Sequence, residues 1–138
     1  MRLLLDTCAI IFRAQGEPMS KAAGAAIDRA ARVDGILISP VSAWEIGLLC
    51  RPGRRDALQL GPNPSAWFAR VMSEPGAVEA SLTYDIAIDS TNLPGEFHRD
   101  PADRFLVATA RALNVPIVTR DGDIEAYAKA GHVKLIKC

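Results

Sequence analysis

The chain has 138 residues, of which about half are apolar, and its 16 basic residues balance its 16 acidic residues to a formal charge of zero. This length and apolar content predict one domain, residues 1–138, that buries about two-thirds of the surface of its unfolded chain. A neutral chain lacks an overall positive field, so any contact with nucleic acid has to come from local basic groups or bound cations.

The sequence shows no sign of a targeting segment or of a disulfide framework. The apolar start of the chain meets Asp6 too soon for a signal-peptide core, and no later apolar run approaches the roughly eighteen residues of a membrane span. The three cysteines are odd in number and far apart, which argues against disulfides and against a zinc site. We therefore expect a cytoplasmic protein that does not contact a membrane.

Short apolar runs alternate with helical patterns along the whole chain. The expected strands are residues 2–5, 36–38, 78–82, 115–118 and 133–136. Helices are expected shortly after Asp6, after Pro40, and over residues 20–32, 65–73, 84–90, 101–113 and 121–130. This alternation predicts an α/β fold with a mainly parallel central sheet of about five strands, flanked by helices and joined by right-handed crossovers.

The best-defined helix is expected to begin at Pro101. Asp100 is a typical N-cap residue, and proline suits the first helical position. Asp103 shares a helix face with Leu106 and Ala110, which places an acid at the start of the expected buried stripe. Taken alone, such an acid is explained by its favourable interaction with the helix dipole.

Four acids lie just after expected strands or near the start of the helix that follows. They are Asp6, Glu45, Asp103 and Asp121. Capping explains each of them separately, and Ser42 with Glu45 has the pattern of a capping box. In a parallel sheet, however, the strand-to-helix junctions share one edge, where open α/β folds bind ligands. Two carboxylates about 6 Å apart repel by roughly 3 kcal/mol at a dielectric near 20, so four together predict a bound cation or shared protons.

The donor set predicts the metal and the chemistry. Carboxylate oxygens without a nearby His or Cys favour Mg²⁺ or Mn²⁺ over zinc. Such ions bridge phosphate oxygens and activate water, so hydrolysis of a phosphodiester is the natural reaction. The sequence contains no G-x-S-x-G, P-loop or G-x-G-x-x-G pattern, and serine hydrolases, NTPases and dinucleotide-binding proteins therefore have no support.

Four stretches resemble, in order and spacing, the motifs of the PIN-domain ribonucleases, and in particular the VapC-type toxins of toxin–antitoxin pairs. They are residues 4–7 (LLDT), 39–46 (SPVSAWEI), 98–104 (HRDPADR) and 118–121 (VTRD). The resemblance covers nearly the whole chain. It implies that Asp6, Glu45, Asp103 and Asp121 form the Mg²⁺ site of an endoribonuclease that acts on single-stranded or structured RNA.

The resemblance also implies supporting residues and partners. Thr7 and Thr119 match positions whose hydroxyls support the site. The implied partners are an RNA substrate, a second copy of the chain in a homodimer, and a cognate antitoxin, a segment of which occupies the acidic groove. Two positions depart from the pattern: Cys8 stands where many relatives have His, and Ala102 stands where many have a bulky aromatic. Neither touches the four acids, so these departures bear on local packing and substrate preference.

Several assignments stay open at this stage. Asp123 competes with Asp121 for the place of the fourth ligand, because the sequence does not fix the turn that joins them. Arg99 and Arg104 are candidate contacts for substrate phosphates, although Arg104 is equally compatible with a solvated helix face. His98 is a candidate proton shuttle.

Two other functions are compatible with the acids. One is a catalytically silent module of the same fold that holds RNA or a protein. The other is a phosphoacceptor receiver domain, which needs a second acid beside Asp6 and a lysine after the last strand. Position 7 is threonine, and Lys134 and Lys137 fall within or at the end of that strand, so the receiver interpretation ranks low.

Overall fold

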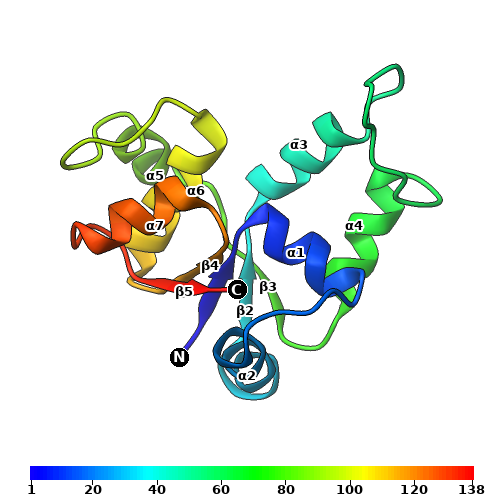
Figure 1. Ribbon diagram of the computed structural model, residues 1–138, viewed down its shortest axis with the longest axis horizontal. Coiled ribbons are helices and arrows are strands. Elements are labelled where there is room, and N and C mark those ends of the chain that lie inside the picture. The colour runs from blue at the N-terminus through cyan, green and yellow to red at the C-terminus, as the bar shows by residue number, and fades with distance from the viewer.

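A five-stranded sheet forms the centre of the computed structural model, which describes residues 1–138 (Figure 1). Its strands are β1 (Leu3–Leu5), β2 (Ile36–Ile38), β3 (Ala77–Glu79), β4 (Ile117–Thr119) and β5 (Leu135–Lys137). Their spatial order is β3-β2-β1-β4-β5, and every neighbouring pair is parallel. The predicted α/β fold with a parallel sheet is therefore confirmed.

Seven α-helices and one π-helical turn connect and flank the strands. They are α1 (Thr7–Ala14), α2 (Lys21–Arg29), η1 (Ala30–Asp34), α3 (Pro40–Leu49), α4 (Pro64–Ser73), α5 (Tyr84–Asp89), α6 (Pro101–Leu113) and α7 (Gly122–Lys129). None of these helices has the length and apolar character that crossing a membrane requires.

The core has two parts, one on each face of the sheet. Side chains alternate along a strand, so Leu4 faces one side and Leu3 and Leu5 face the other. The first side is covered by α5, α6 and α7, and the second mainly by α1, α2 and α4 (Figure 1). The continuous apolar runs of the strands follow from this burial on both faces.

Three helices begin with proline directly after a polar N-cap residue. The caps are Ser39, Asn63 and Asp100, and each side-chain oxygen accepts a hydrogen bond from a backbone N–H of the first turn. Proline is favoured there because the N–H that it lacks has no partner within the helix. The capping prediction for Asp100 is confirmed.

The capping-box interpretation of Ser42 and Glu45 is wrong. Because Ser39 caps α3, Glu45 lies in the second turn, and Ser42 is a fully buried residue inside the helix. The early end of β3 is a second difference from the sequence prediction, since β3 covers only residues 77–79. Neither difference moves Glu45 away from the edge of the sheet, because α3 starts directly after β2.

Candidate metal centre

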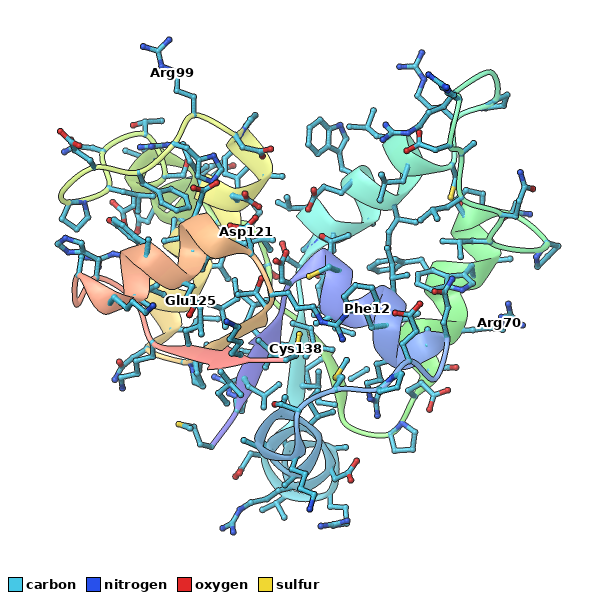
Figure 2. All side chains as sticks on the ribbon, viewed as in Figure 1. Phe12, Arg70, Arg99, Asp121, Glu125 and Cys138 are labelled. Carbon is cyan, nitrogen blue, oxygen red and sulfur yellow. The ribbon has the colours of Figure 1, made fainter.

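The four predicted acids come together in one pocket at the carboxyl-terminal edge of the sheet. Asp6 follows β1 and Asp121 follows β4, whereas Glu45 and Asp103 project from α3 and α6. All four line a pocket of about 430 Å³, together with Asp100. Asp121 lies at the α6–α7 side of the region between the two helical groups (Figure 2). The four acids therefore lie together at the edge of the sheet where the sequence predicted them.

Asp6 is held in one orientation inside the fold. It is only 5% exposed, its Oδ1 accepts a hydrogen bond from the Thr7 N–H at 2.7 Å, and its Oδ2 accepts one from the Thr119 hydroxyl at 2.5 Å. Burial raises the pKa of Asp6, and the hydrogen bonds from Thr119 and Thr7 oppose that rise. The charged form of this carboxyl is thus costly in the metal-free protein.

Glu45 is oriented by a pair of hydroxyls. The Thr7 Oγ1 lies 2.5 Å from Glu45 Oε1 and 2.9 Å from Ser42 Oγ. A hydroxyl carries one proton and the ionised carboxylate can only accept, so the Thr7 proton points to Glu45. Burial raises the pKa of Glu45, and the hydrogen bond from Thr7 opposes that rise. Thr7 therefore links the Asp6 and Glu45 carboxylates, through its N–H and its hydroxyl.

Asp103 experiences the strongest charge crowding. Burial, and after it the negative charges of Asp6, Asp100, Asp121 and Glu45, together raise its pKa to about 8. The Asp103 backbone N–H donates to Asp100 Oδ1 at 3.2 Å, so the N-cap residue also brings its charge to the pocket. A bound cation would favour the ionised form of Asp103 and release protons.

His98 lies beside Asp103, with Nε2 at 3.0 Å from Asp103 Oδ2. The Nε2 atom is buried, but its alignment with that oxygen does not make a hydrogen bond. Nδ1 accepts a hydrogen bond from the Asp100 N–H at 3.3 Å, so the neutral ring carries its proton on Nε2. Ligand atoms of His98, Asp103 and Asp121 lie within 4.8 Å of one another, so the expectation that no His lies near the acids is wrong. The carboxylates outnumber this single imidazole, and a predominantly oxygen donor set still favours Mg²⁺ or Mn²⁺.

Asp121 and Asp123 occupy different positions. Asp121 caps α7 by accepting hydrogen bonds from the backbone N–H groups of Asp123 and Ile124 through Oδ1, both at 2.9 Å. Its Oδ2 accepts no hydrogen bond and is available to a cation. The Asp123 side chain is 72% exposed and does not line the pocket. The geometry thus favours Asp121 over Asp123 as the fourth donor.

The two arginines suggested as phosphate contacts do not line the pocket. Arg99 is exposed and points outward from the molecule (Figure 2). Arg104 is half-buried and donates hydrogen bonds to the carbonyls of Ser90, Phe97 and His98 at 2.8, 3.2 and 3.1 Å. Arg104 therefore fixes the loop that carries His98, and its guanidinium is engaged by the protein instead of being free in solvent.

Two polar residues of the pocket, Cys8 and Arg120, were not assigned a role from the sequence. The expectation that Cys8 does not touch the four acids is wrong, because Cys8 Sγ lies 3.6 Å from Asp6 Oδ2. Burial and then the Asp6 charge raise the pKa of the Cys8 thiol to about 12, so it is neutral at physiological pH. Arg120 is the only cation among the residues that line the pocket. Its position between Thr119 and Asp121, two residues of the predicted site, was the signal that could have identified it.

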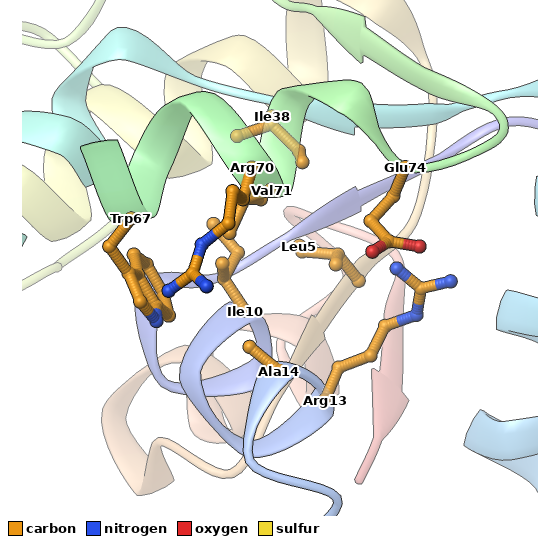
Figure 3. A pocket seen from close by; sticks show the side chains of 9 residues that line it. All are labelled: Leu5, Ile10, Arg13, Ala14, Ile38, Trp67, Arg70, Val71 and Glu74. Carbon is orange, nitrogen blue, oxygen red and sulfur yellow. The ribbon is translucent and has the colours of Figure 1, made fainter. Parts of the chain in front are cut away.

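A second cavity of about 460 Å³ lies between α1 and α4 (Figure 3). Its floor is apolar and includes Leu5, Ile10 and Trp67, and its charged lining residues are Arg13, Arg70 and Glu74. A single acid does not make a site for a divalent cation, which needs several oxygen ligands. The acidic pocket is therefore the better candidate for a divalent cation.

Comparisons with known proteins give one family. A family model described as PIN domain matches residues 3–130. Among curated proteins, Ribonuclease VapC22 of Mycobacterium tuberculosis is 29% identical over 126 residues, which cover 91% of each chain. The solved structure of VapBC2 from Rickettsia felis, bound to a DNA fragment from its promoter, has a TM-score of 0.71 at 13% identity and covers 99% of this chain and 98% of that chain. DNA-bound VapBC from Salmonella typhimurium has a TM-score of 0.67 at 14% identity, with the same coverage. At such identities the two structures show a shared fold.

Proposed function

Because this chain belongs to the PIN domain family, we propose that it is a Mg²⁺-dependent endoribonuclease that acts in the cytoplasm as the toxin of a toxin–antitoxin pair. The observation that carries the proposal is the convergence of four carboxylates, from four separate segments, on one pocket. A curated relative of nearly the same length is named a ribonuclease, which supports RNA as the substrate.

The residues present fit a divalent cation. We assign the metal to Asp6, Glu45, Asp103 and Asp121, whose hard oxygen donors suit Mg²⁺ and also Mn²⁺. Burial, and after it the neighbouring carboxylates, raise the pKa values of Asp6, Glu45 and Asp103, so their charged forms are unfavourable in a way that a bound cation would offset. When bound, the ion would stabilise the charge that develops on the phosphate and favour the ionisation of an attacking water.

The surrounding residues hold the carboxylates in place. Thr119 and Thr7 orient Asp6, and Thr7 also orients Glu45. Hydrogen bonds of this kind keep metal ligands pre-positioned, which matters because a shift of an ångström or less is costly for catalysis. We therefore assign supporting roles to the two threonines.

We also propose an antitoxin partner and a homodimer. The two similar solved structures are VapBC complexes, and a further similar structure is a toxin–antitoxin complex from Klebsiella pneumoniae. A segment of the antitoxin would occupy the acidic pocket and exclude RNA. Co-expression with the product of a small neighbouring open reading frame should give a stable complex that lacks nuclease activity.

Removal of the metal is the direct test of this function. The purified protein should cleave end-labelled single-stranded RNA in Mg²⁺, lose that activity in EDTA, and regain it when Mg²⁺ or Mn²⁺ is added back. Gel electrophoresis of the products measures the rate and shows internal cut sites. Cleavage that persists in EDTA would contradict metal dependence. Binding of RNA and Mg²⁺ without cleavage would instead favour the catalytically silent module.

Replacing Thr119 by Val should weaken the metal site without unfolding the protein. The variant loses the hydroxyl that donates to Asp6 and that accepts from the Asp121 N–H at 3.0 Å. Loss of such a hydrogen bond to a metal ligand typically lowers affinity about 10–100-fold. The Mg²⁺ concentration that gives half-maximal cleavage should rise accordingly.

Thr109→Val is the matched control for this change. Thr109 is buried in α6 and its hydroxyl donates to the Phe105 carbonyl, away from the pocket. Its replacement should leave the Mg²⁺ dependence unchanged. An unchanged Mg²⁺ dependence in a folded Thr119→Val protein would show that the Thr119 hydroxyl does not orient the metal ligands.

A further inference from the structure

Arg120 lines the acidic pocket, and other parts of the protein hold its guanidinium in one position. It lies between Thr119 at the end of β4 and Asp121 at the N-cap of α7, and it lines the pocket formed by the acids. It is exposed, so its charge is accessible from solvent. Five of the other residues that line this pocket are acids, and none is a cation.

Three contacts hold the guanidinium of Arg120. Nη2 donates to the Pro18 carbonyl at 2.8 Å, Nε donates to the main-chain oxygen of Cys138 at 3.2 Å, and Cζ lies 4.0 Å from the centroid of the Phe12 ring. Phe12 and Cys138 lie near each other at the centre of the molecule, below Asp121 in this view (Figure 2). The side chain is therefore ordered before any ligand arrives.

No acidic side chain neutralises Arg120. No Asp or Glu carboxylate lies within ion-pair distance of its guanidinium, although acids line the same pocket. The guanidinium has five N–H donors, and the main-chain oxygens of Pro18 and Cys138 use two of them, which leaves both Nη1 donors and one Nη2 donor. A planar cation with free paired donors matches the oxygens of a phosphate.

We infer that Arg120 is a fixed binding site for a phosphate of the RNA strand that crosses the acidic pocket, next to the phosphate that is cut. The inference rests on the proposed function. The carboxylates of the pocket repel the phosphates of an RNA strand wherever no cation lies between them. Arg120 supplies a permanent positive charge at the edge of the pocket. Contact with a phosphate carries no base preference, so Arg120 contributes affinity and register without choosing a sequence.

A binding experiment separates this role from a structural one. The probe is a labelled single-stranded oligoribonucleotide, and fluorescence anisotropy measures its affinity for the Asp6→Asn protein in Mg²⁺ over a range of salt concentrations. Adding Arg120→Ala should weaken binding about tenfold. The slope of log affinity against log salt should also become shallower by about 0.7, the value for one lost phosphate contact on a single strand.

Two further variants test the charge and its support. Arg120→Lys keeps the charge and should retain the salt slope while losing part of the affinity. Phe12→Leu keeps the arginine and removes the ring beneath it, which should weaken binding about threefold with an unchanged slope. Arg29→Ala is the matched control, because it removes an exposed arginine from α2 and should change neither quantity.

Cleavage kinetics complete the test, with Arg120→Ala introduced into the protein that keeps Asp6. Arg120→Ala should raise KM for RNA about tenfold and leave kcat within a few-fold, whereas a purely structural role would lower the melting temperature and kcat without changing the salt slope. Unchanged affinity and slope in Arg120→Ala would overturn the inference, whether or not the parent protein cleaves RNA. Absence of cleavage by the parent protein would overturn the proposed function alone, because the binding measurements do not depend on cleavage.

Discussion

Replacing Asp6 by Asn should lower the rate of RNA cleavage by about a thousandfold or more, the loss that corresponds to several kcal/mol of transition-state stabilisation. Asp6 is the most buried of the four acids and lies at the end of the central strand β1. Asn keeps one oxygen but removes the negative charge, so the cation loses both a ligand and part of the field that attracts it. The other three acids cannot move in to replace it, because each is fixed on a different element.

The Asp6→Asn protein should remain folded. The Asn oxygen can still accept from the Thr7 N–H, and its amide group can donate to the Thr119 hydroxyl in place of the bond that Asp6 accepts. Burial raises the pKa of Asp6, so removing this charge does not remove a favourable ion pair. Circular dichroism and the thermal transition should therefore match those of the parent or lie above them.

The experiment compares initial rates of cleavage in Mg²⁺ for proteins purified in the same way. Asp28→Asn is the matched control, since Asp28 is an exposed acid on α2 and should leave the rate unchanged. The inactive variant also excludes a contaminating nuclease as the source of the parent activity. A folded Asp6→Asn protein that cleaves RNA at the parent rate would show that the acidic pocket is not the catalytic centre.

Most of the fold could be predicted because local signals and tertiary structure agree. The runs at residues 3–5 and 36–38 are apolar at every position, as strands buried on both faces require. The start of α3 was misplaced because two polar residues compete for the cap. Ser39 is followed by Pro40, as Asp100 is followed by Pro101, and the proline decides the start in both helices.

The site was predictable only as far as topology determines it. Parallel strands bring their carboxyl ends to one edge, so the meeting of the four acids follows from the order of elements. The position of Arg104 does not follow from the order of elements. The loop at residues 90–98 has no periodicity, and its carbonyls accept hydrogen bonds from the Arg104 guanidinium. Arg120 likewise depends on Pro18 and Cys138, which are distant in sequence.

Replacing Asp103 by Asn should stabilise the metal-free protein near pH 8 by about 2 kcal/mol, less than the full pKa shift would give because solvent screens this partly exposed carboxyl. The effect near pH 4 should be small. The pKa of Asp103 is raised to about 8 in the folded protein from an ordinary value of 3.8. Between these values the unfolded chain releases a proton that the folded protein retains, so a rise in pH favours unfolding. The parent protein should therefore lose stability from about pH 4 to pH 8, and the variant should lose less.

A competing effect has the opposite sign and is smaller. Asp103 lies in the first turn of α6, where a negative charge interacts favourably with the helix dipole, and Asn forfeits roughly 0.3–1 kcal/mol of that interaction. Each pKa unit of the shift corresponds to about 1.4 kcal/mol before solvent screening, so removing a buried and crowded charge still outweighs this loss at high pH. Asp85→Asn is the matched control: Asp85 is an exposed acid in the first turn of α5, and its replacement should destabilise slightly near pH 8, where Asp103→Asn stabilises.

Urea unfolding of the metal-free parent and of Asp103→Asn across this pH range measures the difference in their free energies of unfolding. In saturating Mg²⁺, we expect the order of the two stabilities to be reversed. The cation binds the folded parent and stabilises it by mass action, whereas Asn at position 103 removes a ligand and most of that gain. The parent should thus be the less stable protein without metal and the more stable one with it. If Asp103→Asn destabilises the metal-free protein equally at pH 4 and pH 8, neither burial nor the neighbouring carboxylates raise the pKa of Asp103, and the argument for a cation in the pocket loses its electrostatic basis.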